Sequence, residues 1–542
     1  MFLLLGIWYN ACFSVCFVLL PPMASSSPEK AAIVPHNAEF CKGLTIKKVH
    51  PIEPADISTL TNSLSADVLQ ALRRTIKRSG VPVYFVGGTV RDCLLGRISH
   101  DLDLAVAGSP VGVAKILQRE LGEGTLVDLS SPGEETVRLV WRGEQIDISA
   151  LRAGVESIEE DLRLRDFTIN AMALLFTACE DNGEDWALID PTGGLDDLRQ
   201  GCIRHCSGAF IADPVRMLRG FRMRATLGFY LVESTRQAIS DHATLIGTVA
   251  AERISYEMQL IFASTRTSAT LREMAETGLL RQLLPELYQA EGVEQPEFHH
   301  LDVFEHCFLA LQMMETIIAG PERFFPGHGR RIAAYLQEEG VSRSLKWAAL
   351  MHDIGKPATK KTRADKDGRV TFYGHDEVGR ELFTQFAQKA KWSRADTAMV
   401  GELIGMHMHP FHLCNVQRQE PLSKRAALNL CHRAEQSLIG LFLLAMSDSL
   451  ASRGEKKPER MEEELVTLFT TVRKIYEEDI APVLHGPRLV SGRDLIEHFN
   501  LAPGPLFSKI LSELEAARVE GKVVDKPTAL AWIQDYVQEQ SS

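Results

Sequence analysis

The stretch FVGGTVRDCLLGRISHDLDLAV (85–106) decides how the N-terminal half of this chain folds. β-Branched and aromatic residues lead into Gly87 and Gly88. Glycines at the end of a strand let backbone N–H groups approach a phosphate, because no Cβ intervenes. The segment DLDLAV then alternates acidic and apolar residues, so a strand there places Asp101 and Asp103 on one face. Two carboxylates this close are costly unless a cation neutralises them, and Mg²⁺ is a hard cation that prefers oxygen ligands.

Helices and strands alternate around this stretch. Helical spacing predicts helices at about 60–79, ending at a glycine, and at 111–122. The β-rich or alternating runs predict strands at 81–88, 101–108, 137–141 and 145–149. Asp147 lies on the last of these strands and offers a third carboxylate for a two-metal site. The mixture predicts a small α/β domain that extends to about residue 195.

The rest of the chain is helical in pattern. Beyond residue 200 the periodicity is almost entirely that of helices, so the fold class is α+β. The charged stretch RGEKKPERMEEEL (453–465) indicates a surface turn or linker within this half.

Composition limits the class of protein. The chain has 542 residues, 45% of them hydrophobic, and a formal net charge of −12 from 59 Lys and Arg against 71 Asp and Glu. At about 150 residues per domain, three or four domains are expected. The balance excludes a disordered, collagen-like or disulfide-stapled chain and argues against a uniformly basic nucleic-acid coat, although a local basic groove is compatible with it. Ten cysteines without a CxxC pair indicate a reducing, cytoplasmic location.

The N-terminus carries a separate question. Residues 1–20 hold no charge and are long enough to span a bilayer, but the positive segment of a signal peptide is missing. We favour Met23 as the real start of the protein. A membrane anchor at 1–20 is the alternative, and residues 1–55 are treated as an N-terminal extension.

The motifs resemble those of a known family. The stretch 85–106 resembles the head motif of the class II tRNA nucleotidyltransferases and bacterial poly(A) polymerases, in the DNA polymerase beta superfamily. Further family-like segments follow in the family's order at 159–174, 190–198, 212–229, 251–258 and 276–287. The resemblance covers about residues 80–290 and implies a small mixed α/β nucleotidyltransferase head followed by all-helical domains.

The resemblance implies roles for named residues. Asp101 and Asp103, joined by Asp147 as the third catalytic carboxylate, would bind two Mg²⁺ ions. The remaining positions bind the nucleotide. Gly87, Gly88 and Arg91 would surround the triphosphate, and Arg165, Asp166 and Asn170 would hold the sugar and phosphates. Asp213 and Arg216 would contact the base, and Arg219 follows one helical step further on. A carboxylate accepts from an exocyclic amine and arginine donates to ring acceptors, a pattern that suits cytosine and adenine and rejects uracil and guanine.

Three departures from the family pattern stand out. Leu164 replaces the first arginine of the usual Arg-Arg-Asp, and Ala212 replaces the glutamate before Asp213. The segment SALRAGVESI (149–158) is shorter than the flexible loop of many CCA-adding members. A short loop resembles CC-adding enzymes, although some A-adding and CCA-adding members are short as well.

Histidines gather in the helical half. Ten of the 17 histidines lie between 299 and 432, and His352-Asp353 ends an apolar helix. The segment LKWAALMHDIGKP resembles the HD phosphohydrolase signature, with His306 and Asp448 as the remaining ligands. The resemblance adds His375, and His407 or His409, as extra ligands of binuclear members. Mixed histidine and carboxylate ligands suit a divalent transition metal such as Mn, Ni or Co.

Together these patterns predict five regions. They are an N-terminal extension (1–55), a nucleotidyltransferase head (56–199), a helical neck (200–292), an HD domain (293–455) and a helical C-terminal region (456–542).

The implied function is a tRNA nucleotidyltransferase that adds the 3′-terminal CCA from CTP and ATP by two-metal nucleotidyl transfer, together with an HD-domain phosphohydrolase activity. The alternatives are a CC-adding, A-adding or poly(A) polymerase relative, and an HD phosphohydrolase whose head only binds. The expected partners are the tRNA 3′ end, CTP and ATP. No protein partner is predicted, and no membrane unless residues 1–20 form an anchor.

Overall fold

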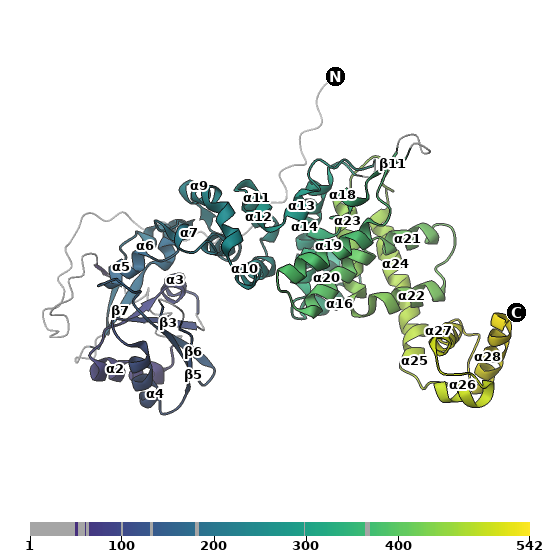
Figure 1. Cartoon of the computed structure of the whole chain (residues 1–542), viewed down its shortest axis with the longest axis horizontal. Coiled ribbons are helices and arrows are strands. Elements are labelled where there is room, and N and C mark those ends of the chain that lie inside the picture. The colour runs from purple at the N-terminus through teal and green to yellow at the C-terminus, as the bar shows by residue number, and fades with distance from the viewer. Residues whose placement is uncertain are drawn as a thin grey trace, which may run out of the picture.

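The computed structural model describes residues 49–51, 60, 64–98, 101–130, 134–178, 184–296, 299–363 and 369–541. The Met23 start, the anchor at 1–20 and most of the N-terminal extension lie outside these residues, but Val49–Pro51 of that extension form β1 and pair with β8 of the head sheet. The molecule is elongated, with the sheet at one end and the C-terminal helices at the other (Figure 1). Within the described part of the chain, no helix is both long and apolar enough to cross a membrane.

An eight-stranded sheet forms the head, in the order β1-β8-β7-β2-β3-β6-β5-β4. β3 and β6 pair in parallel, and the other neighbouring strands pair antiparallel. The strands are β1 (Val49–Pro51), β2 (Val83–Val86), β3 (Asp101–Val106), β4 (Thr125–Asp128), β5 (Thr136–Trp141), β6 (Glu144–Ala150), β7 (Ala173–Ala178) and β8 (Glu184–Ile189).

The head helices cover and flank this sheet. They are α2 (Ala66–Ser79), α3 (Gly88–Leu94), α4 (Pro110–Leu121), α5 (Ile158–Arg163), the 3-10 turn η2 (Thr168–Asn170) and α6 (Gly194–Gln200). α2 and α4 pack side by side and contact strands of the sheet. α2 begins later than predicted because the Ser65 side chain accepts the Val68 N–H and caps the helix, and it ends at left-handed Gly80, as predicted.

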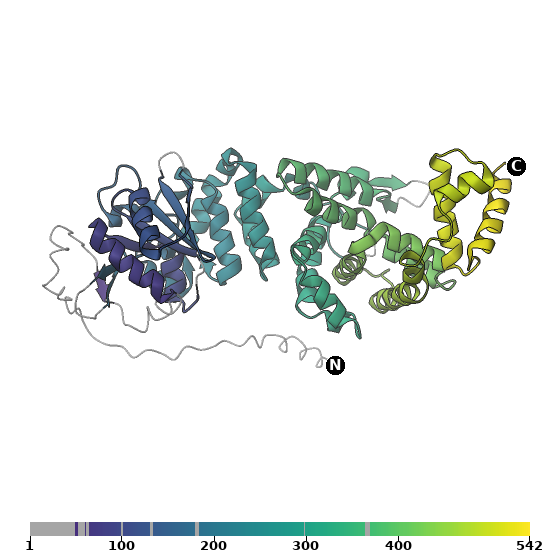
Figure 2. The ribbon, with the colours of Figure 1, turned by 90° about the horizontal axis from the view of Figure 1, so that it is seen from below.

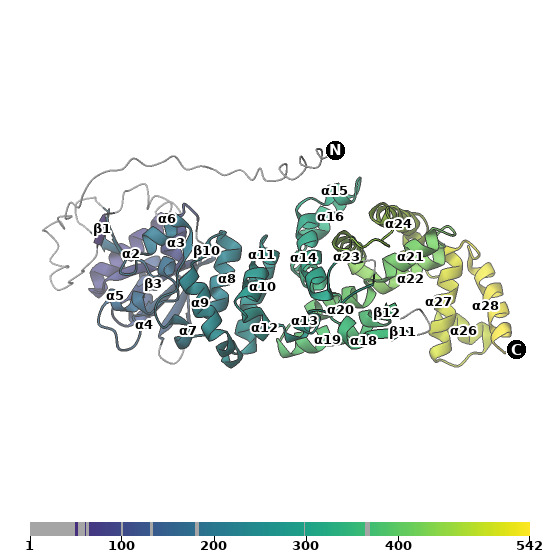
Figure 3. The same cartoon turned by 90° about the horizontal axis from the view of Figure 1, so that it is seen from above.

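A helical neck stands between the head and the next domain, as Figure 3 shows from above. It comprises α7 (Ala209–Ala212), α8 (Arg216–Leu227), α9 (Glu233–His242), η3 (Ala243–Thr248), α10 (Ala251–Ala263), α11 (Thr267–Glu276), α12 (Leu279–Leu283) and α13 (Pro285–Tyr288). Two short parallel strands, β9 (Cys202–Ile203) and β10 (Tyr230–Leu231), interrupt the otherwise helical pattern.

The following domain surrounds one almost wholly buried helix, α23 (Leu438–Ala451), against which α14 and α17 pack. Its other elements include the hairpin β11 (Lys361–Arg363) and β12 (Arg369–Thr371). The helices are α14 (Val303–Ala319), α15 (Pro321–Phe324), α16 (Gly329–Leu336), α17 (Val341–Met351), α18 (Lys356–Thr359), α19 (His375–Lys389), α20 (Arg394–Met406), α21 (His409–Gln417), α22 (Lys424–Ala434) and the 3-10 turn η5 (Glu435–Ser437).

The C-terminal region ends the chain at the far end of the molecule (yellow in Figure 2). It consists of α24 (Met461–Ile475), a π-helical turn (Tyr476–Ile480), α25 (Ala481–Leu484), α26 (Gly492–Phe499), α27 (Pro505–Val519) and α28 (Lys526–Ser541). The predicted turn at 453–465 is partly right, since the connection covers its first half and α24 begins at Met461. Residues of α26, α27 and α28 share a small hydrophobic core of their own, around Leu495, Ile510 and Ile533.

Candidate nucleotide and metal sites

The glycine pair forms the tight turn between β2 and α3. Gly87 has φ 65° and ψ −130° and precedes α3, which begins at Gly88. A Cβ on Gly87 would lie 3.0 Å from Nη1 of Arg165 and 3.7 Å from Oδ2 of Asp103. A Cβ on Gly88 would lie 3.6 Å from Nη2 of Arg91 and 3.9 Å from the same Asp103 oxygen. Gly87 therefore needs glycine for its backbone angle and for the close approach of Arg165, whereas a Cβ on Gly88 would make only ordinary contacts.

The carboxylate strands lie next to this turn. β3 and β6 pair in parallel with Asp103 opposite Asp147 and Asp101 opposite Gln145. The Asp103 N–H donates to Oγ1 of Thr89 at 2.9 Å, which ties β3 to α3. Both Asp147 oxygens accept hydrogen bonds from Arg138 of β5, at 2.7 and 2.8 Å. Asp147 is thus beside Asp103 but is paired with an arginine, and its role as a metal ligand stays a prediction.

Asp166 and Asn170 sit at the centre of a buried polar network. Asp166 Oδ1 accepts from Asn170 Nδ2 at 3.1 Å, and its Oδ2 lies 3.0 Å from Nη1 of Arg219. Asn170 Oδ1 accepts from Nη1 of Arg91 at 2.8 Å. Burial raises the pKa of Asp166, but Arg219 and Asn170 outweigh burial and leave that pKa below its usual value. The network joins α3, η2 and α8, which are distant in sequence.

Arg165 is buried beside the glycine turn. Its Nε lies 3.4 Å from Oδ2 of Asp161 but makes no hydrogen bond within the described residues. Burial lowers the pKa of Arg165, and the neighbouring Asp161 opposes that shift. Arg165 thus lies beside the glycine turn with a hydrogen-bond donor that has no partner in the described part of the chain. This arrangement fits the predicted contact with a triphosphate.

The predicted base-reading pair, Asp213 and Arg216, lies at the junction between α7 and α8. Asp213 follows α7, and its two oxygens accept from Nη1 and Nη2 of Arg253 at 3.1 and 2.6 Å. Arg216 begins α8 and donates from Nη1 to the carbonyl of Leu164 at 3.0 Å. Its Nε has no hydrogen-bond partner in the part of the chain that the structure describes. Leu164, a departure from the family pattern, therefore still contributes a backbone contact to the pair.

Glu257 of α10 is a functional neighbour that the sequence analysis missed. Its carboxylate lies 3.3 Å from Nε of Arg222 and 4.0 Å from Nε of Arg219, so these two arginines share a helical face. Burial raises the pKa of Glu257, and the two arginines oppose the shift. The segment 251–258 signalled this position only as a family-like motif, without a role.

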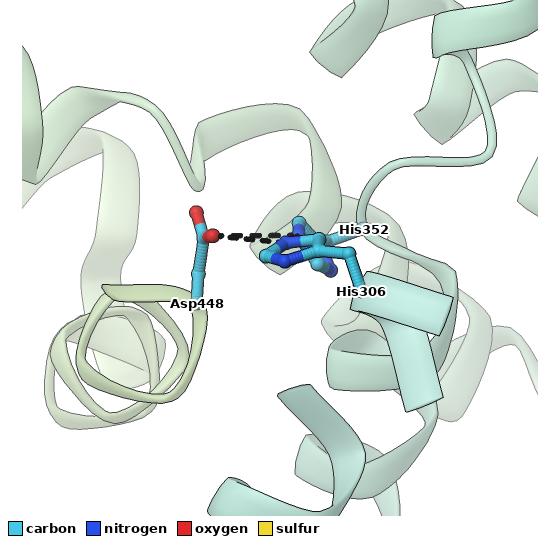
Figure 4. Close-up of side chains that lie close together, drawn as sticks. All are labelled: His306, His352 and Asp448. Carbon is cyan, nitrogen blue, oxygen red and sulfur yellow. Dashed lines mark hydrogen bonds and ion pairs between the residues drawn. The ribbon is translucent and has the colours of Figure 1, made fainter. Parts of the chain in front are cut away.

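Four of the predicted metal ligands converge in the HD domain. Figure 4 shows His306 of α14, His352 at the end of α17 and Asp448 of α23 pointing toward one another. Nε2 of His306 lies 3.2 Å from Nε2 of His352 and 3.1 Å from Oδ1 of Asp448. Oδ2 of Asp353 lies 3.2 Å from Nε2 of His352 and 3.5 Å from that of His306.

A second pair of histidines meets the other oxygen of Asp353. Nε2 of His375 and of His407 lie 3.3 and 3.7 Å from its Oδ1, and 3.1 Å from each other. His409, the alternative to His407, bonds Arg433 instead. One carboxylate thus faces two histidine pairs with its two oxygens, so Asp353 would hold a metal together with histidines from either pair.

Backbone contacts orient these imidazoles. Nδ1 of His352, His375 and His407 lies 3.0, 2.8 and 2.7 Å from the carbonyls of Ala349, Phe372 and Ile404 respectively. A carbonyl only accepts, so Nδ1 carries the proton and the lone pair of Nε2 faces the cluster. Buried imidazole lone pairs and carboxylates that converge at 3–4 Å fit a divalent transition metal.

Two further polar side chains adjoin the cluster and were not predicted. Lys356, one helical turn after Asp353, places Nζ 2.6 Å from Oδ2 of that carboxylate. His299 stacks edge-on against His306 with ring centroids 4.6 Å apart, and its Nδ1 lies 3.0 Å from Oγ of Ser452. Burial raises the pKa of Asp353, but His352 and Lys356 outweigh it and hold that pKa well below the usual value.

Known families match the same regions. The "Poly A polymerase head domain" model matches residues 83–204, and the "HD domain" model matches 303–438. Models of an RNA-binding segment of polymerase A and of the second domain of tRNA nucleotidyltransferases match 228–290 and 462–533. The A-adding tRNA nucleotidyltransferase of Deinococcus radiodurans is 33% identical over 84% of this chain and 95% of its own length.

The chain belongs to the class II tRNA nucleotidyltransferase and poly(A) polymerase family, with an HD domain. The CC-adding tRNA nucleotidyltransferase of Thermus thermophilus is 31% identical over 83% of this nucleotidyltransferase and 92% of its own length. The fold matches the solved Thermotoga maritima CCA-adding enzyme in complex with tRNA, with a TM-score of 0.57, 20% identity, and coverage of 89% of this chain and 98% of that one. The α+β fold class predicted from the sequence is confirmed.

Proposed function

We propose that this nucleotidyltransferase completes the 3′-terminal CCA of tRNA from CTP and ATP. The observation that carries the proposal is the pair of Asp213 and Arg216 at the entrance to α8, next to the buried network of Asp166. Cytosine and adenine both present an amine donor beside a ring-nitrogen acceptor. Arg253 uses two of the lone-pair sites of Asp213 and leaves others for the amine, and the guanidinium of Arg216 would donate to the ring.

Different side chains of the head hold the metal ions and bind the triphosphate. Asp101 and Asp103 would hold Mg²⁺, which supplies activation of the 3′-hydroxyl and neutralisation of the departing pyrophosphate. The backbone N–H groups of the glycine turn, with Arg91 and Arg165, bind and orient the triphosphate. Positioning and charge stabilisation account for the chemistry, so no covalent enzyme intermediate is required.

Partial addition, of CC or of A alone, is the second candidate. β6 ends at Ala150 and α5 begins at Ile158, so the connection is short. Its Arg152 donates from its backbone N–H and from Nη1 to Oδ1 of buried Asp161, both at 3.0 Å, which fixes the connection to α5. A fixed, short segment favours a narrower product range than a mobile loop. The two relatives named above, an A-adding and a CC-adding enzyme, favour this candidate too.

One experiment separates these products. The full chain is incubated with tRNA transcripts that end before the CCA, after CC, or complete, with labelled CTP and ATP supplied separately and together. Incorporation of both nucleotides in order, stopping at A, supports CCA addition. CTP alone indicates CC addition, ATP alone on the CC-ending transcript indicates A addition, and long A tails indicate a poly(A) polymerase. No incorporation on any transcript contradicts the proposal.

We also propose that the HD domain is a metal-dependent phosphohydrolase of phosphate esters. The convergent Nε2 atoms and the Asp353 carboxylate support this role, because such ligands activate a bound water as a nucleophile. The test supplies Mn²⁺, Ni²⁺ or Co²⁺ with 2′,3′-cyclic nucleotides and simple phosphodiesters. Hydrolysis that disappears in His352→Ala supports the role, and the absence of hydrolysis with every metal contradicts it.

A cytoplasmic location remains part of the proposal. Cys202, Cys206, Cys307, Cys414 and Cys431 are buried thiols outside any disulfide, which suits a reducing compartment.

A further inference from the structure

Helix α10 connects the base-reading pair to the HD domain. Near its start, Arg253 binds both oxygens of Asp213. One turn later, Glu257 contacts Arg219 and Arg222 of α8. The positions of Asp213, which precedes α8, and of Arg219 and Arg222, which lie within α8, therefore depend on the position of α10.

The other end of α10 is held by a lysine of the HD domain. Lys346 of α17 is 4% exposed, and its Nζ donates to the carbonyl of Phe262 at 3.1 Å and to the carbonyl of Ser264. It also donates to Oγ1 of Thr267 at 3.3 Å. The Phe262 and Ser264 carbonyls lie at the C-terminal end of α10, where the Thr267 hydroxyl also reaches them, and the ammonium is their charged donor. The ammonium is thus the C-terminal cap of a helix in a different domain.

A second contact pair strengthens this junction. The rings of Phe262 and Trp347 stack with centroids 3.6 Å apart and an interplanar angle of 6°. Glu315 of α14 accepts the N–H of Thr267 at 2.7 Å and that of Ser268 at 3.2 Å, at the first turn of α11, and lies 3.8 Å from Nζ of Lys346. α14 and α17, which supply these contacts, also carry the HD ligands His306 and His352.

We propose that Lys346 of the HD domain is a positioning residue for nucleotide selection in the head. It caps α10 and thereby holds Arg253 and Glu257, which in turn hold Asp213 and Arg219 in the base-reading geometry. At 1.5 Å per residue, the cap is about 13 Å along α10 from Arg253, a length that a single helix transmits as a rigid rod. The inference rests on the proposed base-reading role of Asp213 and Arg216.

The test replaces the ammonium while keeping the length of the side chain. In the full chain, Lys346→Met is compared with the wild type by equilibrium binding of CTP, ATP and UTP without RNA, and by KM and kcat for incorporation into tRNA. Discrimination of CTP and ATP against UTP is expected to fall about tenfold, and KM to rise by a similar factor, while kcat at saturation changes less than about twofold. Lys346→Arg, which keeps the charge, is expected to restore most of the discrimination.

Two controls separate positioning from general damage. Arg343→Ala disturbs the same helix, where Arg343 pairs with Asp396 of α20 rather than with the neck, and should leave selection unchanged. Phe262→Leu weakens the junction from the α10 side and should reproduce the loss of discrimination.

The outcomes are distinguishable. Wild-type selectivity in a folded Lys346→Met chain overturns the positioning role, and if Lys346→Met does not fold, wild-type selectivity in Phe262→Leu overturns it. A wild-type chain that binds all nucleotides equally contradicts the base-reading role on which the inference rests.

Discussion

At the scale of single residues, Asp103 is held in place from two directions. Its carboxylate lies against both glycines of the turn, and its backbone is tied to Thr89. Asp103→Asn keeps the shape of the side chain but removes its negative charge, so only Asp101 of the pair remains to neutralise a divalent cation. We expect incorporation of CTP and ATP to fall by about a thousandfold or more, because charge stabilisation carries this chemistry. Filter assays of labelled nucleotide measure the loss.

An unchanged melting temperature in Asp103→Asn is the control, since a folding defect would also remove activity. Asp101→Ala should behave in the same way. Activity within about tenfold of wild type in either variant contradicts the two-metal assignment.

We propose that Asp213 determines which base is accepted rather than how fast the chemistry runs. Asp213→Ala removes the acceptor for the exocyclic amine, so UTP and GTP should be incorporated more readily while the rate with CTP at saturation falls less. A pocket that loses one buried polar contact typically loses about 1–3 kcal/mol of discrimination. Competition assays with pairs of nucleotides measure it. Arg253→Ala should give a weaker change in the same direction, and strict selection of CTP and ATP in Asp213→Ala contradicts the role.

Two histidines, the buried His407 and the partly buried His299, make the metal-free HD domain sensitive to acid. Burial lowers the pKa of His299 and of His407 to about 3, from an ordinary value of 6.5. In the unfolded chain these two histidines therefore become protonated below pH 6.5, whereas in the folded chain they stay neutral until about pH 3. Their contribution to stability is complete above pH 6.5 and is lost as the pH falls toward 3, at about 1 kcal/mol per pH unit for each group.

Circular dichroism melts of the chelator-treated protein, between about pH 4.5 and about pH 7.5, test this slope. His352 acts in the opposite sense, because Asp353 outweighs burial and leaves the pKa of His352 raised. His407→Gln should flatten the decline in acid. A melting temperature that rises on acidification contradicts the assignment.

At the scale of elements, an ion pair fixes α8 to the head, and the carboxylate of this pair is buried. Asp166 is 5% exposed, and Arg219 of α8 is its charged partner. Arg219→Met leaves that carboxylate buried without its cation, which should lower the free energy of unfolding by about 2 kcal/mol. Urea denaturation measures the change. Arg236→Met, which breaks the exposed pair with Glu276, is the matched control and should cost much less.

The elements nearest the motifs were predictable, and several others were not. The strands β2, β3, β5 and β6 and the helix α4 fall within a few residues of their predicted ranges, because alternation or helical spacing marks them locally. The strands β4, β7 and β8 were missed. β7 lies inside the sheet between β8 and β2, and its buried run shows no alternation from which a strand can be recognised.

At the scale of the whole molecule, the HD ligands join α14, α17, α19, α20 and α23 into one unit. A metal bound there stabilises the folded chain by mass action, by about 2.7 kcal/mol at a concentration one hundred times Kd. Mn²⁺, Ni²⁺ or Co²⁺ should therefore raise the melting temperature of chelator-treated protein by several degrees. His352→Ala should abolish the shift. A shift of equal size in that variant would mean that the ion binds elsewhere.

Like the helices and strands, the residues of the candidate sites were predictable from the sequence only in part. His306, His352, Asp353 and Asp448 were predicted together from a resemblance, and the structure brings them together. Arg253, Glu257 and Lys346 could not be predicted, since each acts on a partner that is 35 or more residues away and local patterns carry no signal for such pairs. The net charge of −12 likewise hides the arginines that line one face of α8.

The small core shared by α26, α27 and α28 has a thermodynamic consequence. It is distinct from the large core, which reaches α27 only through Ala516 and Val519, so the two bodies can melt at different temperatures. A calorimetric trace should then contain two heat-absorption peaks, with a van't Hoff enthalpy well below the calorimetric enthalpy. No single transition temperature would then describe the whole molecule, and the part of the tryptophan fluorescence that Trp532→Phe removes would report the smaller body, since the other five of the six tryptophans lie outside it.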